Sequence, residues 1–232
     1  MTYEQIIDRL HALAEPEKVA YKEKKFGVVS QNALGIYMKD IKALAAEIPT
    51  DNELALRLFD SGIYEARLLC SKLFKPKALT MELADKWVAV FDNWEICDSF
   101  SMGIFAKSSL AAPIILSYVQ REPEFEKRAA FATMAAYCMA DKKADNEVFQ
   151  PFFTMIEQAA TDERLYVKKA VNWALRNIGK RNVDLRKDAI ASAERILAMD
   201  TKASRWIAQD ALKELNKEGL RISDYPRSIY RS

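Results

Sequence analysis

Helical periodicity runs through nearly the whole chain, and it constrains the fold more than any other feature of the sequence. Apolar residues recur three and four positions apart in almost every segment, and no segment alternates as a β-strand does. Helix boundaries are expected at Ser61-Gly62, near Asp92-Asn93, at Pro123, at Gly179 and at Gly219. The pattern predicts an all-α protein with roughly ten to twelve helices, each of 10–17 residues, joined by short connections.

Four of the helical segments share a loose template, in which a basic residue precedes small and apolar residues at helical spacing. They are ARLLCSKLF from Ala66, KRAAFATM from Lys127, KKAVNWAL from Lys168 and SRWIAQDAL from Ser204. The basic positions Arg128, Lys169 and Arg205 lie 41 and then 36 residues apart, which matches paired-helix repeats of the HEAT type. We therefore expect residues 1–232 to form a single domain, an α-solenoid built as a right-handed stack of helical pairs with a concave basic groove.

Positive charge is concentrated in the C-terminal part of the chain. The formal net charge is only +2, yet residues 164–232 hold 16 Lys and Arg against 8 Asp and Glu, and residues 1–163 hold 19 against 25. Proteins that bind nucleic acid often carry one such basic region, although the surfaces of helical proteins also vary in charge without function.

Several other classes of protein lack support in the sequence. No apolar run approaches the roughly 20 residues of a membrane helix, and the N-terminus does not resemble a signal peptide. The three widely spaced cysteines and the single histidine, His11, predict neither a disulfide framework nor a zinc site. Glycine-rich phosphate loops, a GxSxG elbow and an HExxH helix are absent from the sequence. We expect a cytoplasmic protein that uses no metal and no cofactor.

Four residues on predicted helices have the chemistry to hold a cationic sugar or base. Trp94 and Asp98 are four positions apart, so one helix face carries both, while Arg128 and Trp173 lie on later helices. A carboxylate can stabilise positive charge that develops during a reaction, and indole rings can pack against a cation. The alternative is structural, with Asp98 in an ion pair with Arg128 and the tryptophans filling the core.

The helix of Trp173 also lies in a basic field, which suits a polyanion such as DNA. The candidate DNA-binding cations are Lys168, Lys169, Arg176, Lys180 and Arg181. Lys180 and Arg181 follow a helix end, where cations also complement the helix dipole. The remaining tryptophans, Trp87 and Trp206, are assigned to packing.

The segments WEICD, KRAAF and VKKAVNWALRNIGKRN occur in this order on helical units, and they resemble the AlkD-like family of HEAT-like-repeat DNA alkylation-repair glycosylases. The resemblance runs from about residue 33 to about residue 215 and is most specific in the last of these segments. It implies that Asp98 is the active-site carboxylate, that Trp94 and Trp173 are the groove tryptophans, and that Arg128 is the groove arginine.

The resemblance also implies the reaction, which is hydrolysis of the N-glycosidic bond of cationic N3- or N7-alkylated purines in duplex DNA. It implies an open groove without base flipping, and no pocket-building loop is recognisable in the sequence. We expect a monomer that associates with the nucleoid when bound to DNA. Two alternatives stay open: a relative without excision activity that binds distorted or branched DNA, and a scaffold that binds a protein.

Two departures from the family pattern bear on this interpretation. Glu95 stands where the family commonly has aspartate. The N-terminal segment EPEKVAYKEKKFGVVSQNALG does not match the family's lesion-contacting helix, and Lys22, Lys24 and Lys25 are either phosphate contacts or solvated charges.

Overall fold

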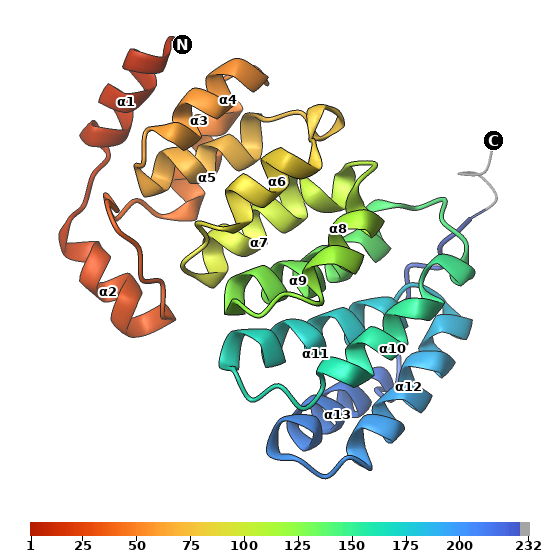
Figure 1. Cartoon of the computed structure of the whole chain (residues 1–232). Helices are drawn as coiled ribbons and strands as arrows, with labels where there is room; N and C mark the ends of the chain where they lie inside the picture. The colour runs from red at the N-terminus through yellow and green to blue at the C-terminus, as the bar shows by residue number, and fades with distance from the viewer. Residues whose placement is uncertain (228–232) are drawn as a thin grey trace. The chain divides into compact units, whose positions relative to one another are not determined.

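The computed structural model describes residues 1–227, and these form thirteen α-helices and three short 3-10 helices, with no β-strand among them (Figure 1). The helices are α1 (Tyr3–Ala12), α2 (Glu17–Phe26), α3 (Met38–Ala46), α4 (Asn52–Asp60), α5 (Tyr64–Leu73), η1 (Pro76–Ala78), α6 (Met81–Val88), α7 (Trp94–Gly103), η2 (Phe105–Lys107), α8 (Ala111–Tyr118), α9 (Glu124–Ala140), η3 (Asn146–Val148), α10 (Gln150–Ala159), α11 (Leu165–Gly179), α12 (Val183–Leu197) and α13 (Lys202–Leu215). The predicted all-α fold is confirmed. None of the helices in residues 1–227 has the length and apolar character needed to cross a membrane.

Most of the helix boundaries fall where the sequence places them. Breaks are found at Ser61-Gly62, between α6 and α7, at Pro123 and at Gly179. The expectation for Gly219 is wrong, because α13 already ends at Leu215 and Gly219 lies beyond it with φ +68°. The described chain has thirteen α-helices against the ten to twelve predicted, and α3, α4, α6 and α8 are shorter than the expected 10–17 residues, with only eight or nine each.

The chain divides into two compact units, unit 1 from Met1 to Leu110 and unit 2 from Ala111 onward. In unit 1, α3, α5 and α7 pack side by side, and α4 packs against α5 (Figure 1). The core of this unit centres on Trp87, which is fully buried with the rings of Phe59, Phe74 and Phe100 around it at centroid distances of 5.7, 5.0 and 5.0 Å. The assignment of Trp87 to packing is confirmed.

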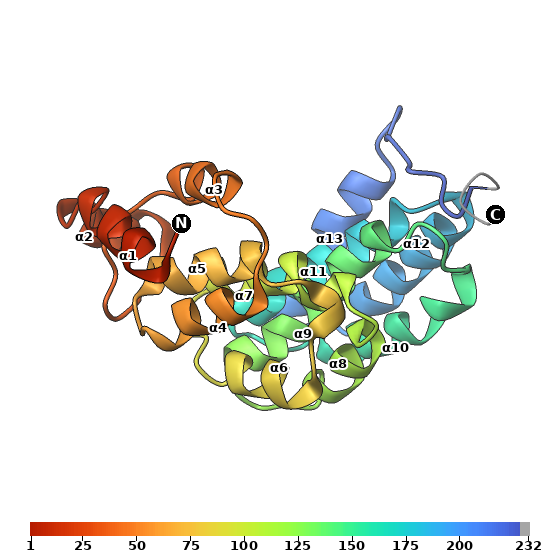
Figure 2. The ribbon, with the colours of Figure 1, turned by 90° about the horizontal axis from the view of Figure 1, so that it is seen from above.

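Unit 2 consists of two layers of helices. The most extensive packing is between α9 and α11, and α13 also packs against α11, whereas α8, α10 and α12 lie on the other side of this row (Figure 2). The three basic positions of the sequence template, Arg128, Lys169 and Arg205, fall on α9, α11 and α13. The 41- and 36-residue spacings therefore mark successive helices of one layer, as the repeat interpretation predicts.

Close packing in unit 2 explains one of its glycines. A Cβ atom on Gly179 would lie 2.7 Å from Leu215 Cδ2 and 2.9 Å from the Cβ of Ala189. The end of α11 thus contacts both α12 and α13 at a position where only glycine fits without displacing its neighbours.

Candidate functional site

The N-terminus of α7 is fixed by Asn93, whose side-chain oxygen accepts three hydrogen bonds. Asn93 Oδ1 accepts from the backbone amides of Glu95 and Ile96, at 2.9 and 3.2 Å, and from the Tyr64 hydroxyl at 3.0 Å. These bonds satisfy helix amides that would otherwise lack a partner. Asn93 is fully buried, so the start of α7 is held firmly against α5.

Trp94 and Asp98 lie on successive turns of α7, as the spacing predicts. The Trp94 indole N–H donates to the carbonyl oxygen of Phe26 at 2.8 Å, which fixes the orientation of a ring that is only half-buried. Phe26 is the last residue of α2, where carbonyls lack helical partners. Asp98 is also half-buried. Neither side chain is sealed in the core of unit 1.

The N-terminal helix α2 is anchored to α7 by a buried ion pair. Lys22 Nζ lies 2.9 Å from Glu95 Oε2 and is almost fully buried. The Tyr64 hydroxyl lies 2.9 Å from the same carboxylate oxygen and shares its single proton between this oxygen and Asn93 Oδ1. Burial and the nearby Glu95 carboxylate raise the pKa of Tyr64, so its hydroxyl remains a donor. Lys22 is therefore neither a phosphate contact nor a solvated charge. Glu95, which stands where the resembled family commonly has aspartate, thus has a structural role in binding Lys22.

The segment between α2 and α3 is held by a second buried carboxylate. Glu65 accepts from the backbone amides of Leu34, Gly35 and Ile36 at 2.8, 3.0 and 3.2 Å. Burial raises the pKa of this carboxyl group, although the amide bonds act in the opposite direction. Gly35 has φ +83°, and a Cβ there would lie 2.2 Å from the Glu15 carbonyl oxygen. This geometry shapes the segment that leads into α3.

Together α2, this segment, the start of α3 and α7 border an open pocket of about 470 Å³. Most of its surface is apolar and comes from Phe26, Val28, Tyr37, Met38 and Trp94. Lys22, Lys39 and Glu95 complete the lining. No pocket-building loop is recognisable in the sequence, yet these elements form a pocket. No local pattern could reveal the pocket, because Phe26 and Trp94 are 68 positions apart.

Arg128 lies on α9 in unit 2 and is buried. Its Nη1 donates to the Tyr166 carbonyl oxygen at 2.7 Å, and the neighbouring backbone amide of Tyr166 donates to Glu124 at 3.1 Å. These bonds join the N-terminal turns of α9 and α11. Arg128 therefore has a structural role within unit 2, in addition to any contact with a ligand.

Four residues of α11 and its C-cap that reach the surface follow one helical stripe. Lys169, Trp173, Arg176 and Lys180 recur at spacings of three and four, while Val167, Ala170, Ala174 and Ile178 are buried on the opposite face. Lys169 is exposed and Trp173 is half-buried. Both are therefore available at the surface of unit 2.

The other cations of this region are already engaged with groups of unit 2. Arg176 and Lys180 both bind the carboxylate of Glu214 on α13, Lys180 at 2.7 Å, and Arg176 also lies 3.5 Å from Asp210. They join α11 to α13, so their charge is largely neutralised locally.

The expectation that Arg181 binds DNA is corrected by the structure. Arg181 is fully buried, and its guanidinium donates to the carbonyl oxygens of Cys138, Asp141 and Ala144. The same group lies 4.5 Å from the centroid of the Phe149 ring. These hydrogen bonds hold the loop that follows α9, and the buried guanidinium is not accessible to a phosphate.

The assignment of Trp206 to packing is also wrong. Trp206 on α13 is 40% exposed, and Lys168 Nζ from α11 lies 5.6 Å from its ring centroid. The buried residues of α13 are Ala203, Ser204, Ile207, Ala208, Ala211 and Leu215. Position 206 lies outside this series, so the helical periodicity alone would have placed the indole at the surface.

Each unit thus contributes half of the predicted constellation. Unit 1 brings Trp94 and Asp98 together on α7, and unit 2 carries Arg128 on α9 and Trp173 on α11. That the two halves meet in one groove stays a prediction.

Comparison with known proteins identifies relatives over almost the whole chain. The family model described as "DNA alkylation repair enzyme" matches residues 6–215. A solved structure described as "A new family of proteins related to the HEAT-like repeat DNA glycosylases with affinity for branched DNA structures" is similar with a TM-score of 0.73 and 18% sequence identity, over 98% of this chain and 100% of that chain. No curated protein matches. The structural likeness agrees with the predicted stack of HEAT-like repeats.

Proposed function

Because the chain belongs to the DNA alkylation repair enzyme family, we propose that it is a monofunctional DNA glycosylase acting on cationic N3- and N7-alkylated purines in duplex DNA. The observation that carries the proposal is the start of α7. There a half-buried carboxylate, Asp98, follows one turn after an indole, Trp94, whose ring is fixed by a hydrogen bond.

The chemistry needs little beyond such a carboxylate. An alkylated purine already bears positive charge, so the bond between C1′ and the base nitrogen breaks with its electron pair moving to the base, which leaves neutral. The deoxyribose becomes an oxocarbenium ion, and Asp98 stabilises that charge electrostatically. Asp98 also orients a water molecule whose oxygen adds to C1′, and the proton released passes to the carboxylate or to solvent.

Some of the remaining predicted residues hold the DNA. Trp94 and Trp173 pack against the sugar and the backbone around the cationic centre. The exposed Lys169 contacts phosphates, which helps to fix the register of the duplex without reading its sequence. Arg128 is buried and acts by holding the Tyr166 carbonyl at the start of α11. In this proposal the two units act together as one domain on one duplex, without a cofactor and without flipping a paired base.

Release of 7-methylguanine from a duplex by the wild-type protein and by Asp98→Asn tests the activity. We expect wild type to release the base and Asp98→Asn to do so about 10²- to 10³-fold more slowly. Asp92→Asn, in the connection just before α7, is the matched control and retains activity. Release by Asp98→Asn at the wild-type rate contradicts the assigned role.

A second function is favoured by the solved relative, which is described as having affinity for branched DNA. In this alternative the protein binds distorted or branched DNA without excision. Duplex binding by wild type without release of 7-methylguanine would support it. In both cases affinity falls steeply with added salt because phosphate contacts release counterions, whereas a protein-binding scaffold would not show this dependence on duplex.

A further inference from the structure

We propose that the pocket between α2 and Trp94 holds an unpaired nucleobase, so that the protein prefers DNA in which a base lies outside the helical stack. This inference rests on the proposed function, because it takes DNA as the ligand, and it names the form of DNA that this part of the site selects. Four features of unit 1 support it.

The first feature is the shape and chemistry of the pocket. Its volume of about 470 Å³ falls within the range of about 300–1,000 Å³ typical of sites for small organic ligands. Trp94, Tyr37 and Phe26 contribute aromatic rings to the lining, and the hydrogen bond from Trp94 to Phe26 fixes the indole. Rigid aromatic surfaces of this kind stack against nucleobases.

The second feature is the state of the charged groups that line the pocket. The lysine ammonium of Lys22 and the carboxylate of Glu95 bind each other, and Tyr64 donates to the same carboxylate. Since Lys22 and Glu95 satisfy one another, neither offers much hydrogen-bonding capacity to distinguish one base from another. The pocket therefore accepts a base through stacking, which tolerates any sequence.

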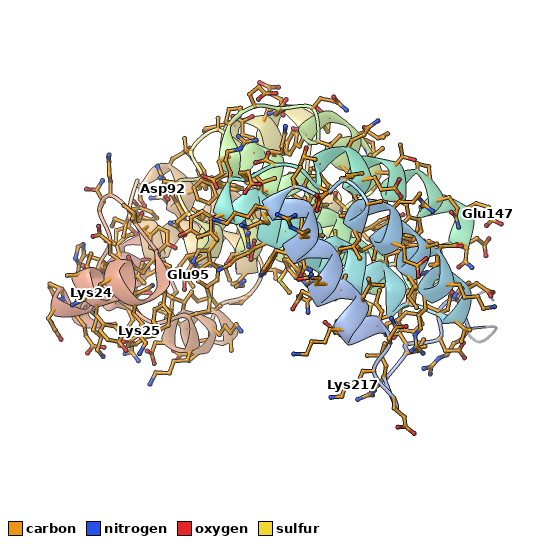
Figure 3. The ribbon with its side chains drawn as sticks, turned by 90° about the horizontal axis from the view of Figure 1, so that it is seen from below. Lys24, Lys25, Asp92, Glu95, Glu147 and Lys217 are labelled. Atoms are coloured by element: carbon orange, nitrogen blue, oxygen red, sulfur yellow. The ribbon has the colours of Figure 1, made fainter. Side chains whose placement is uncertain are left out.

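The third feature is the charge around the pocket. Residues 18–25 hold four lysines and one glutamate. Lys24 and Lys25 are exposed, and Figure 3 shows them on α2, with Glu95 toward the interior of unit 1. Lys39 is also exposed and lines the pocket itself. These cations suit the phosphates on either side of a base that has left the stack.

The fourth feature is the position of Asp98. It lies one turn along α7 from Trp94 but does not line the pocket, so an unpaired base seated against the indole does not take the place of the lesion's sugar at Asp98. A paired base must be unstacked before it can enter the pocket, whereas a base in a bulge, a gap or a branch has already left its partner. The pocket therefore favours DNA with unpaired bases.

The test compares two duplexes that carry the fluorescent base 2-aminopurine, one with the base in a single-nucleotide bulge and one with it paired. We expect wild type to bind the bulged duplex roughly 5- to 100-fold more tightly, as stacking of one base predicts, and to quench its fluorescence. The variant Met38→Trp fills the pocket and removes this preference. Met81→Trp is the matched control, because Met38 and Met81 are both half-buried first residues of a helix.

If Met38→Trp does not fold, a second variant tests the same pocket. Phe26→Ala removes an aromatic wall that is 45% exposed and leaves the backbone carbonyl that holds Trp94. It should lower the preference for the bulge, while Tyr21→Ala, an exposed aromatic of the same helix outside the pocket, should lower it less.

Equal affinity of wild type for both duplexes, or a preference that survives Met38→Trp or Phe26→Ala, overturns the inference and leaves the proposed glycosylase intact. Preference for the bulge without release of 7-methylguanine supports the pocket and contradicts the glycosylase. Wild type that binds neither duplex overturns both.

Discussion

The helix α7 of unit 1 and the helix α11 of unit 2 both carry a tryptophan among charged residues, but they use those charges differently. On α7 the neighbouring carboxylate, Glu95, binds Lys22 and thereby fastens α2 beside Trp94. On α11 the cations Arg176 and Lys180 bind Glu214 of the next repeat. In unit 1 the ion pair builds the wall of a pocket, whereas in unit 2 the ion pairs join one repeat to the next.

The comparison shows that not every cation of a basic run in a repeat sequence is available to bind a partner, because carboxylates of the next repeat neutralise some of them. Glu214 lies 38 residues after Arg176 and 34 after Lys180, about one repeat away. Stacking of the repeats brings this acidic residue to the cations. Of the predicted DNA-binding residues, Lys169 is the exposed one, and Lys168 lies over the ring of Trp206.

Arg181→Ala should give the largest change in stability. It tests whether this cation belongs to the core of unit 2. Removal of the guanidinium leaves three buried carbonyl groups without their donor, and we expect the free energy of unfolding to fall by about 3 kcal/mol or more. Urea denaturation measures this loss. Arg205→Ala, on the surface of α13, should stay within about 0.5 kcal/mol of wild type. If Arg181→Ala is as stable as wild type but binds DNA more weakly, Arg181 contacts DNA and is not a core residue.

Lys22→Met tests the ion pair of unit 1. The change leaves the Glu95 carboxylate without its cation at a largely buried position, and we expect a loss of about 2–3 kcal/mol. Urea denaturation measures the loss, and hydrogen exchange should rise in α2. The double variant Lys22→Met with Glu95→Gln should recover part of the loss. Lys25→Met, on the exposed side of the same helix, is the control, and a similar loss there would refute the anchoring role.

Salt dependence of duplex binding separates the two kinds of cation on α11. Lys169→Ala should reduce the slope of log affinity against log salt by about 1, as expected when one lysine no longer neutralises a phosphate. Arg176→Ala should leave this slope nearly unchanged, because its guanidinium is held by Glu214. A larger change in slope for Arg176→Ala than for Lys169→Ala would reverse the assignment.

The smallest effect concerns pH. Burial alone would raise the pKa of Glu214, but the hydrogen bonds from Lys180 and Arg176 outweigh it and lower the pKa below the usual value of 4.5. A carboxyl whose pKa is lower in the folded state stabilises the protein above its unfolded pKa, and the contribution is lost as the pH falls through the folded value. Glu214→Gln should therefore be less stable than wild type at pH 7, by less than about 1 kcal/mol in urea denaturation, and the difference should shrink as the pH falls below 4.5. A difference that persists in acid would show that packing, not charge, is responsible.

The sequence predicted the elements that depend on local spacing. Helix boundaries at Gly62, Asn93 and Gly179 follow from capping and backbone preferences, and the face shared by Trp94 and Asp98 follows from the helical repeat. The tertiary partners of charged residues were not predictable in this way. Arg181 and Lys22 look like ordinary surface cations, and only the fold brings carbonyls 37–43 residues away to Arg181 and Glu95 to Lys22.

Trp206 and the pocket illustrate two different limits. The exposure of Trp206 was available from the periodicity of α13, since its buried neighbours follow a series that omits position 206. The pocket was not available, because it depends on the turn at Gly35, on the amides held by Glu65 and on the contact between Phe26 and Trp94. Such long-range geometry leaves no pattern in a single sequence.

The central claim is that α7 presents a carboxylate to a positively charged lesion, and charge selectivity tests it most directly. Base release is measured under single-turnover conditions from two duplexes that differ in one nucleotide, one with 7-methylguanine, which is cationic, and one with hypoxanthine, which is neutral. We predict release of 7-methylguanine alone, and loss of that release in Asp98→Asn. Equal release of both bases, or release of 7-methylguanine that is undiminished in Asp98→Asn, would contradict it.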